Sequence, residues 1–206
     1  MLVDISSLSP RERYRLMIQA IVPRPIAWVL SESGPDNYNL APFSYFTGVS
    51  SAPPLLMLSI GPKPSKEEKD TLANIEARKH FVVHIPHSAQ VEQVTESSRT
   101  LPHGESELPK AGVETVPFDS FSLPRVKGCR VALGCKHFQT VRLPGVAQSI
   151  VFGEMLMAHL DDAVSQMGDP NQAPIIDVKQ LDPLARLGNN DYAELGKSMT
   201  VPLATE

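Results

Sequence analysis

The sequence of 206 residues lacks the glycine-rich motifs that usually mark a nucleotide-binding site. Its 12 glycines are never closer together than six residues. That spacing excludes both the dinucleotide fingerprint GxGxxG and the phosphate loop GxxxxGK(S/T). The nucleophile motif GxSxG is missing as well. The chain therefore carries no dedicated dinucleotide or nucleoside triphosphate domain of these types.

The sequence also has no large excess of positive or negative charge and no long hydrophobic run. The formal net charge of -4 is spread along the chain, so there is no basic surface that would attract nucleic acid. No apolar run approaches the roughly 20 residues needed to cross a bilayer. The N-terminus has no basic segment followed by an apolar core, as a secretory signal would have. These absences predict a cytoplasmic protein with neither a membrane nor a nucleic-acid partner.

Cysteine is rare, and histidine offers no convincing metal site. Cys129 and Cys135 lie on the same face of one extended stretch, too far apart for an easy disulfide, so we expect two reduced packing residues. His84 and His87 form an HxxH pattern in a strand that is interrupted by Pro86. Their side chains should point in opposite directions, and no metal site is predicted.

The length and the 42% of hydrophobic residues fit one globular domain that needs no disulfide or metal to stabilise it. We expect a single domain over residues 1–206, with a core at about 15–165 and a C-terminal tail at 166–206. The segment 148–160 is nearly apolar throughout and is expected to be buried on both faces.

Short strands outnumber helices in the local patterns. One helix is predicted at 11–20, a second that begins with Asp70 or Thr71 as its cap, and a third at 88–98. A long loop of little intrinsic order is expected at 101–124. Strand-like runs occupy 26–30, 39–50, 53–61, 80–85, 129–138 and 148–160. The prediction is a mainly β fold with six or seven strands and two or three helices, most simply a small antiparallel barrel.

Two features of the sequence suggest a binding site for a phosphorylated aromatic ring. Lys69 and Thr71 stand at a predicted helix start, where free N–H groups and the helix dipole attract phosphate. An ordinary helix cap is the alternative reading of this pair. Prolines beside strand-like runs stiffen the backbone and leave polar groups outside the ladder, where they could bind the edge of a flat heterocycle. These prolines are Pro23, Pro25 and Pro42.

Aromatic side chains near the prolines could form the walls of such a pocket, or could belong to the core. They are Trp28, Phe43, Tyr45 and Phe46. A planar ring joined to a single phosphate describes flavin mononucleotide (FMN).

Four segments, PRPIAWV, NLAPFSYF, SSAPPLLMLSIG and KDTLANI, occur in this order and resemble the flavin reductase-like family, the FMN-binding split barrels. The resemblance covers about residues 15–165. It implies a split barrel of antiparallel strands that pairs as a homodimer, with FMN near the dimer interface. It also implies a set of FMN-binding residues: Arg24, Asn39, Leu40, Ala41, Pro42, Ser44, Ser59, Ile60, Lys69, Asp70, Thr71 and Asn74.

Within that set, the resemblance places Asn39 to Pro42 and Ser44 beside the isoalloxazine ring, with Ser59 and Ile60 as the next wall. The segment from Lys69 to Asn74 would meet the ribityl phosphate. Arg24 would meet the phosphate or a flavin carbonyl.

The activity implied by the resemblance is that of an NAD(P)H:flavin reductase, such as the reductase component of a two-component monooxygenase. Hydride would pass from nicotinamide C4 to flavin N5, with NADH or NADPH as donor and no catalytic acid or base in the protein. One departure weakens the nicotinamide part, because Gln148 stands where typical reductases carry a histidine. The alternatives are an FMN-binding electron carrier, an oxygenase-type flavoprotein without NAD(P)H activity, or a non-enzymatic flavin-binding module.

Overall fold

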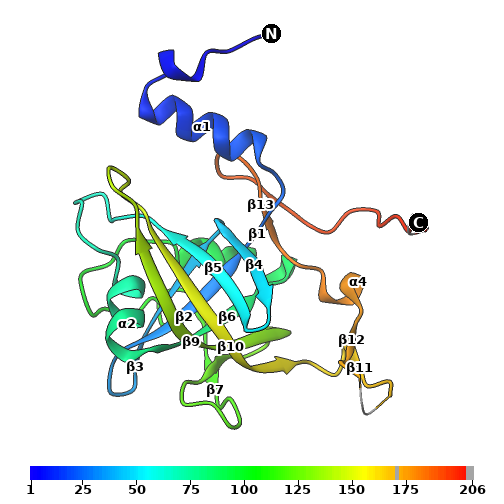
Figure 1. Ribbon diagram of the computed structural model, residues 1–206. Helices are drawn as coiled ribbons and strands as arrows, with labels where there is room; N and C mark the ends of the chain where they lie inside the picture. The colour runs from blue at the N-terminus through cyan, green and yellow to red at the C-terminus, as the bar shows by residue number, and fades with distance from the viewer. Residues whose placement is uncertain (170–171, 203–206) are drawn as a thin grey trace.

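One curved antiparallel sheet of seven strands dominates the computed structural model, which describes residues 1–169 and 172–202 (Figure 1). The strand order is β3-β2-β6-β9-β10-β5-β4. The edge strands β3 and β4 follow each other in the chain but do not pair, so the barrel is split between them. The strands are β2 (Ala27–Gly34), β3 (Asn37–Phe43), β4 (Phe46–Ser51), β5 (Pro54–Ile60), β6 (His80–Ile85), β9 (Val131–Arg142) and β10 (Ser149–Leu160). The predicted antiparallel split barrel is confirmed.

Helices are few, as expected, and the longest stands away from the barrel (Figure 1). This helix, α1, begins with a capping box in which the Ser9 and Glu12 side chains bond each other's backbone N–H groups. The helical elements are η1 (Ile5–Ser7), α1 (Pro10–Ala20), α2 (Asp70–Arg78), η2 (Ser88–Gln90), α3 (Val91–Glu96) and α4 (Val178–Leu181). The short strands are β1 (Arg24–Pro25), β7 (Thr115–Val116), β8 (Arg125–Val126), β11 (Ser165–Gln166), β12 (Ile175–Ile176), β13 (Ala185–Arg186) and β14 (Tyr192–Ala193).

Strand β2 is buried on both faces because two hydrophobic clusters lie on either side of it. Trp28 and Leu30 pack into one cluster, with Val94 of α3 and residues of the loop at 101–124. Ala27 and Val29 point the other way, into a cluster that includes Leu72 and Ile75 of α2. The alternation follows from the period of two in a strand. The packing on the two faces of β2 holds β3 and α2, which border the site described below, in place.

The prediction that 148–160 is buried on both faces was wrong. Leu156 is 46% exposed and Met157 is 38% exposed. Strand β10 pairs with β5 only as far as Glu154. Beyond that residue β5 no longer lies beside β10, and some of the apolar side chains there are exposed. The apolar run was correctly read as a strand, but not all of it is core.

The predicted helix cap was also wrong. The cap residue of α2 is Lys69, and no side chain caps the helix. Asp70 cannot serve, because its carboxylate bonds Lys63 and His103 instead.

The loop at 101–124 is packed against the barrel rather than loosely attached. Glu107, Val113 and Phe118 are buried. The C-terminal tail also returns to the barrel, where β13 pairs with β1 (Figure 1) and Leu184 joins the core. Residues 170–171 and 203–206 of the expected tail lie outside the described residues.

Several single residues have clear structural roles. Cys129 and Cys135 are free and buried, as predicted for packing residues, and burial raises the pKa of Cys129 to about 12. Gly153 leaves room for the Phe81 ring, since a Cβ there would lie 2.4 Å from Phe81 Cζ. Within the described part of the chain, no helix is both long and apolar enough to span a membrane.

His84 is a fully buried core histidine on β6. Its Nδ1 lies 3.0 Å from the Trp28 carbonyl oxygen, and its Nε2 lies 2.9 Å from the Val126 backbone nitrogen. Because a backbone N–H can only donate, Nε2 accepts, and the proton of the neutral ring sits on Nδ1.

Candidate functional site

A polar pocket opens where β3, the start of α2, the segment after α3 and the loop at 101–124 meet. We call it the Lys69 pocket. Its walls come from four separate stretches of chain, which the two hydrophobic clusters hold together. The lining residues are Asn39, Ala41, Pro42, Lys63, Lys69, Asp70, Thr71, Ser97, Ser98, Arg99, Thr100, Leu101 and Glu107.

Lys69 supplies a positive charge that the protein does not neutralise by contact. Its ammonium group has neither a hydrogen-bond nor an ion-pair partner among the described residues, and it lies 5.7 Å from the centroid of the Phe43 ring. Burial lowers the pKa of Lys69, while the nearby charge of Glu107 acts to raise it. A half-buried, unpaired ammonium group favours an anion in this pocket.

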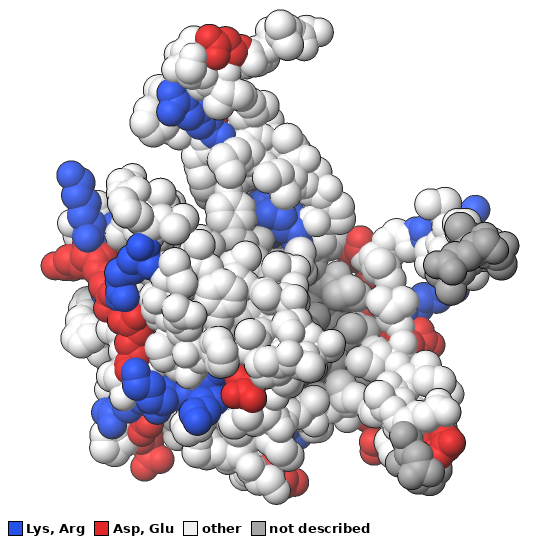
Figure 2. All heavy atoms as spheres, viewed as in Figure 1, with Lys and Arg blue, Asp and Glu red and all other residues white. Residues whose placement is uncertain are grey.

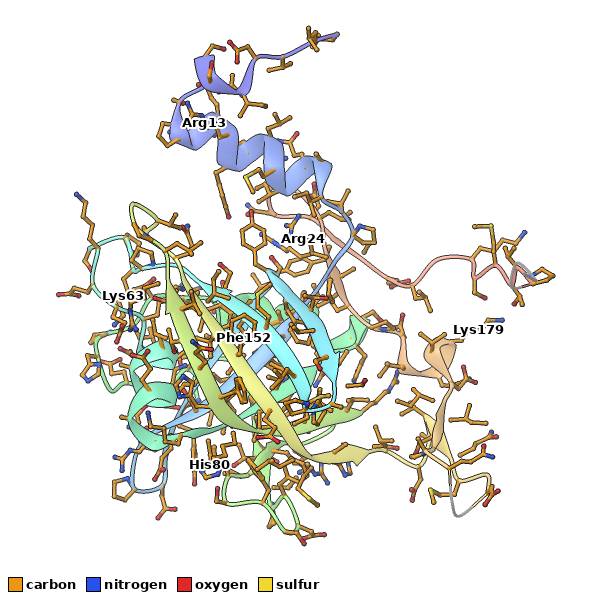
Figure 3. The ribbon with its side chains drawn as sticks, viewed as in Figure 1. Arg13, Arg24, Lys63, His80, Phe152 and Lys179 are labelled. Atoms are coloured by element: carbon orange, nitrogen blue, oxygen red, sulfur yellow. The ribbon has the colours of Figure 1, made fainter. Side chains whose placement is uncertain are left out.

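Lys63 and Asp70 form the second charged group of the pocket (Lys63 is labelled in Figure 3). Lys63 Nζ lies 2.9 Å from Asp70 Oδ1, and His103 Nδ1 lies 2.8 Å from the same oxygen. Burial acts to raise the pKa of Asp70, but the hydrogen bonds and charges of Lys63 and His103 together outweigh it and lower the pKa. The ionised Asp70 carboxylate therefore orients Lys63 and offsets its charge.

The start of α2 adds donors from the backbone. Leu72 and Ala73 already donate their N–H groups to the Lys69 carbonyl. The N–H groups of Asp70 and Thr71 come before them, where a helix has no carbonyl to accept them. With the positive end of the helix dipole, they make this wall of the pocket attractive to phosphate.

Three buried side chains form a connected chain at the base of the Lys69 pocket. The Asn39 amide lies 2.9 Å from Thr71 Oγ1 on one side and 3.3 Å from Glu107 Oε1 on the other. An ionised carboxylate can only accept, so the amide nitrogen faces Glu107 and the amide oxygen accepts from Thr71. Glu107 Oε2 also accepts from the Leu40 N–H at 2.9 Å. Burial raises the pKa of Glu107, against the lowering effect of that hydrogen bond.

The free edge of β3 supplies backbone acceptors. The Tyr38 carbonyl accepts from Ser106 Oγ at 2.5 Å, and the Leu40 N–H donates to Glu107, so both point away from β2. In an antiparallel ladder alternate residues share this direction. Pro42, two residues on, therefore presents its carbonyl but no N–H at the same edge.

A second pocket adjoins the first at Pro42, and we call it the Ser44 pocket. Aromatic and proline side chains form much of its wall, and two residues of α1 close one side. Its lining residues are Tyr14, Ile18, Pro42, Phe43, Ser44, Tyr45, Ser59, Gly61, Pro62 and Gln148. A flat ring in the Ser44 pocket and a phosphate in the Lys69 pocket would meet at Pro42.

Most of the sequence-predicted site residues are brought together by these two pockets. Asn39, Ala41, Lys69, Asp70 and Thr71 line the Lys69 pocket. Ser44 and Ser59 line the Ser44 pocket, and Pro42 lines both.

Arg24 acts instead as a clamp inside the protein (Figure 3). It is 5% exposed, and its guanidinium donates to the carbonyls of Ile18, Ile21 and Leu187 at 2.6, 2.7 and 2.9 Å. It thereby ties the end of α1 and the C-terminal tail to the barrel. A further contact, of 3.3 Å, goes to Ser44 Oγ.

Three other predicted residues direct their side chains away from both pockets. Asn74 donates to Ser31 and Ser33 of β2, at 3.2 and 3.1 Å. Leu40 is fully buried in the core and contributes only its backbone N–H to the site. Ile60 is also a core residue.

The sequence did not reveal several residues that line the Lys69 pocket. Ser97 to Thr100, the SSRT that follows α3, form one wall, and Glu107 comes from the long loop. The only signal was a run of four polar residues after a helix. Among the described residues, no cluster of three or more His, Cys, Asp and Glu side chains could hold a metal ion.

For Trp28, the structure selects the second of its two possible roles. Trp28 is fully buried in the core, where its indole N–H donates to Ser97 Oγ at 2.8 Å.

Known proteins are similar to this chain in sequence or in structure. A relative from Halalkalibacterium halodurans, named only as an uncharacterized protein, is 35% identical over all of this chain and 97% of its own length. Nitrilotriacetate monooxygenase component B from Bacillus cereus has 29% identity and a TM-score of 0.88, covering 98% of each chain. The 2-nitrobenzoate 2-nitroreductase from Pseudomonas fluorescens has 25% identity and a TM-score of 0.87, covering 100% of this chain and 97% of its own. Because the model of the flavin reductase like domain matches residues 19–176, the chain belongs to this family of oxidoreductases.

Proposed function

We propose that this protein binds FMN across the Lys69 and Ser44 pockets and acts as an NAD(P)H:flavin reductase. The observation that carries the proposal is the unpaired ammonium of Lys69 beside the start of α2. A cation without a partner, next to free helical N–H groups, is suited to a phosphate. Family membership makes a flavin the phosphorylated ligand to expect.

The residues present fit the two ends of FMN. Lys69, the backbone N–H groups of Asp70 and Thr71, and the Thr100 hydroxyl would hold the phosphate. The Ser44 pocket, walled by Phe43 and Tyr45, would hold the ring, and the free edge of β3 would accept from its N–H group. We propose FMN rather than FAD because the unpaired Lys69 ammonium beside the start of α2 suits a single phosphate.

The protein's contribution to the reaction would be binding and orientation. When bound, the flavin supplies the two-electron chemistry, accepting hydride from a reduced nicotinamide. Apart from two tyrosines, Tyr14 and Tyr45, no titratable side chain among the described residues lines the Ser44 pocket. This agrees with a reaction that needs no protein acid or base. Gln148, which also lines the pocket, stands where typical reductases have histidine and would contact the donor or the ring through its amide.

We also propose a homodimer and a monooxygenase partner. The exposed apolar side chains of β4 and β10, among them Val49, Leu156 and Met157, would be covered by a second copy. Figure 2 shows this face of the barrel as a broad area almost free of charged residues. Similarity to nitrilotriacetate monooxygenase component B supports a role that delivers reduced flavin to a separate oxygenase.

Flavin titration of the apoprotein tests the binding site. The Lys69→Gln substitution removes the unpaired ammonium group, and it should raise the Kd for FMN roughly 10- to 100-fold, equivalent to about 1.5 to 3 kcal/mol. Lys69→Arg keeps the positive charge and is the matched control. An unchanged Kd in the glutamine variant would remove the phosphate from this pocket.

Anaerobic mixing of the FMN-loaded protein with NADH and with NADPH tests the activity. Loss of the oxidised flavin absorbance with either donor is the expected result. FMN binding without bleaching by either donor would contradict the reductase role and favour an electron carrier or a flavin-binding module.

A further inference from the structure

A third pocket lies beside the other two, on the side where the C-terminal tail returns to the barrel. We call it the Arg186 pocket. It shares Pro42 and Ser44 with the Ser44 pocket, and Pro42 and Ser98 with the Lys69 pocket. Arg186 of β13 and Tyr192 of β14 form its outer wall. A ligand here would therefore touch the same stretch of β3 as a flavin in the two neighbouring pockets.

The guanidinium of Arg186 is held in place but is not neutralised. It lies 4.4 Å from the centroid of the Tyr192 ring, and its Nη2 donates to the Asn189 carbonyl at 2.6 Å. The Tyr192 hydroxyl in turn donates to Thr95 Oγ1 at 3.1 Å, since the Thr95 hydroxyl gives its own hydrogen to the Val91 carbonyl. Nε and Nη1 of Arg186 have no hydrogen-bond partner in the described part of the chain. A planar fork fixed in this way binds phosphate with little loss of side-chain freedom.

Arg186 lies beside a second arginine in the sheet. It is the register partner of Arg24 on β1, so two residues of like charge are paired across the strands. Neither arginine forms an ion pair with a carboxylate among the described residues. Arg24 is buried and donates to three backbone carbonyls, as described above. Arg186 has donors to spare, which makes it the group that a ligand can reach.

We infer that Arg186 binds a phosphate of the reduced pyridine dinucleotide that serves as the electron donor. This rests on the proposed function, because the donor must approach a flavin in the Ser44 pocket. The nicotinamide would lie toward that pocket, and the shared residues Pro42 and Ser44 connect it with the Arg186 pocket. A dinucleotide carries its pyrophosphate away from the nicotinamide, which suits a phosphate site at a distance from the ring. Arg186 would set affinity for the donor without taking part in hydride transfer.

Calorimetric titration of the FMN-loaded protein with NAD⁺ and NADP⁺ tests this inference without using turnover. The Kd for FMN is measured first, so that a failure of the proposed function is recognised separately. Arg186→Gln should leave the FMN Kd unchanged and weaken dinucleotide binding about 10- to 100-fold, the effect of one charge-assisted hydrogen bond. Equal losses for both dinucleotides assign Arg186 to the pyrophosphate, and a loss confined to NADP⁺ assigns it to the 2′-phosphate.

Two controls separate recognition from folding. Arg186→Lys keeps the charge and should recover part of the affinity, whereas Arg78→Gln, an exposed arginine at the end of α2, should change nothing. Nicotinamide riboside in its reduced form has no phosphate, so its KM should be the same in wild type and Arg186→Gln.

Three results would overturn the inference. The first is wild-type affinity for both dinucleotides in Arg186→Gln, and the second is a wild-type protein that binds FMN but neither dinucleotide. The third is a loss of FAD binding in Arg186→Gln with dinucleotide binding intact, which would assign the pocket to the flavin's own adenylate.

Discussion

Acid should destabilise this protein through one buried histidine. His84 is neutral and fully hydrogen-bonded in the core, and burial lowers its pKa from 6.5 to about 4. Protonation would place a hydrogen on Nε2, opposite the Val126 N–H, and turn a hydrogen bond into a contact between two donors. In the unfolded chain the ring takes up the proton near pH 6.5. The contribution of His84 to stability should therefore be constant above that pH and fall as the pH drops toward 4.

The size of the effect follows from the two pKa values. Between pH 7 and pH 5 the loss should be about 2 kcal/mol, and it approaches about 3 kcal/mol when the folded form also becomes protonated. That is a large part of the stability of an ordinary domain. Urea unfolding of the apoprotein at a series of pH values, followed by the fluorescence of the single tryptophan, Trp28, would measure it.

Comparison with His84→Gln isolates this one group from the other histidines. Glutamine cannot titrate, so the variant lacks the contribution of His84. Between pH 7 and pH 5 its free energy of unfolding should fall by about 2 kcal/mol less than that of the wild type. His80→Gln, on the same strand but partly exposed, is the control and should follow the wild type. Identical pH dependence in wild type and His84→Gln would refute the reasoning, even if the variant were less stable at every pH.

Two further substitutions test packing and electrostatics. Gly153→Ala should destabilise the protein by about 1 to 3 kcal/mol, because a Cβ would overlap the buried Phe81 ring; thermal unfolding would measure this, and an unchanged Tm would contradict it. Glu107→Gln keeps an oxygen for the Leu40 N–H but removes a carboxylate from the Lys69 pocket. FMN binding should tighten on the order of tenfold at neutral pH and vary less with pH, since a like charge in a partly solvated pocket costs roughly 1 to 2 kcal/mol. Fluorescence titration from pH 5 to pH 8 would show this, and weaker binding throughout would contradict it.

The barrel was predictable because its strands carry their own signals. The apolar runs at 26–30 and 80–85 predicted strands, and both form strands of the barrel. Their apolar side chains are largely buried, as the pattern suggested. The start of α2 was also recognisable from residue types, although its cap residue was not, and the Asn39–Pro42 edge was recognised through the family resemblance. These parts depend on local sequence and on the period of the side chains.

The rest of the site depends on contacts between distant segments. Glu107 reaches Leu40 because the loop at 101–124 packs its apolar residues on the barrel. The local sequence of such a loop, rich in proline and glycine, does not predict its position on the barrel. Arg24 is a clamp because Leu187, 163 positions away, returns to meet it. Arg186 becomes a candidate ligand-binding residue because the C-terminal tail also returns to the barrel, where β13 pairs with β1. Such pairings are decided by tertiary packing, and no single stretch of sequence contains them.

The buried series Glu107, Asn39 and Thr71 works as a proton-dependent selector of donors and acceptors. While Glu107 is ionised, the Asn39 amide must offer it nitrogen, and its oxygen then consumes the hydroxyl hydrogen of Thr71. Once Glu107 is protonated, the amide can turn over and donate to Thr71, whose own hydrogen is released toward the pocket. The protonation state of Glu107 thus decides whether the Thr71 hydroxyl can donate a hydrogen bond to an anion in the Lys69 pocket.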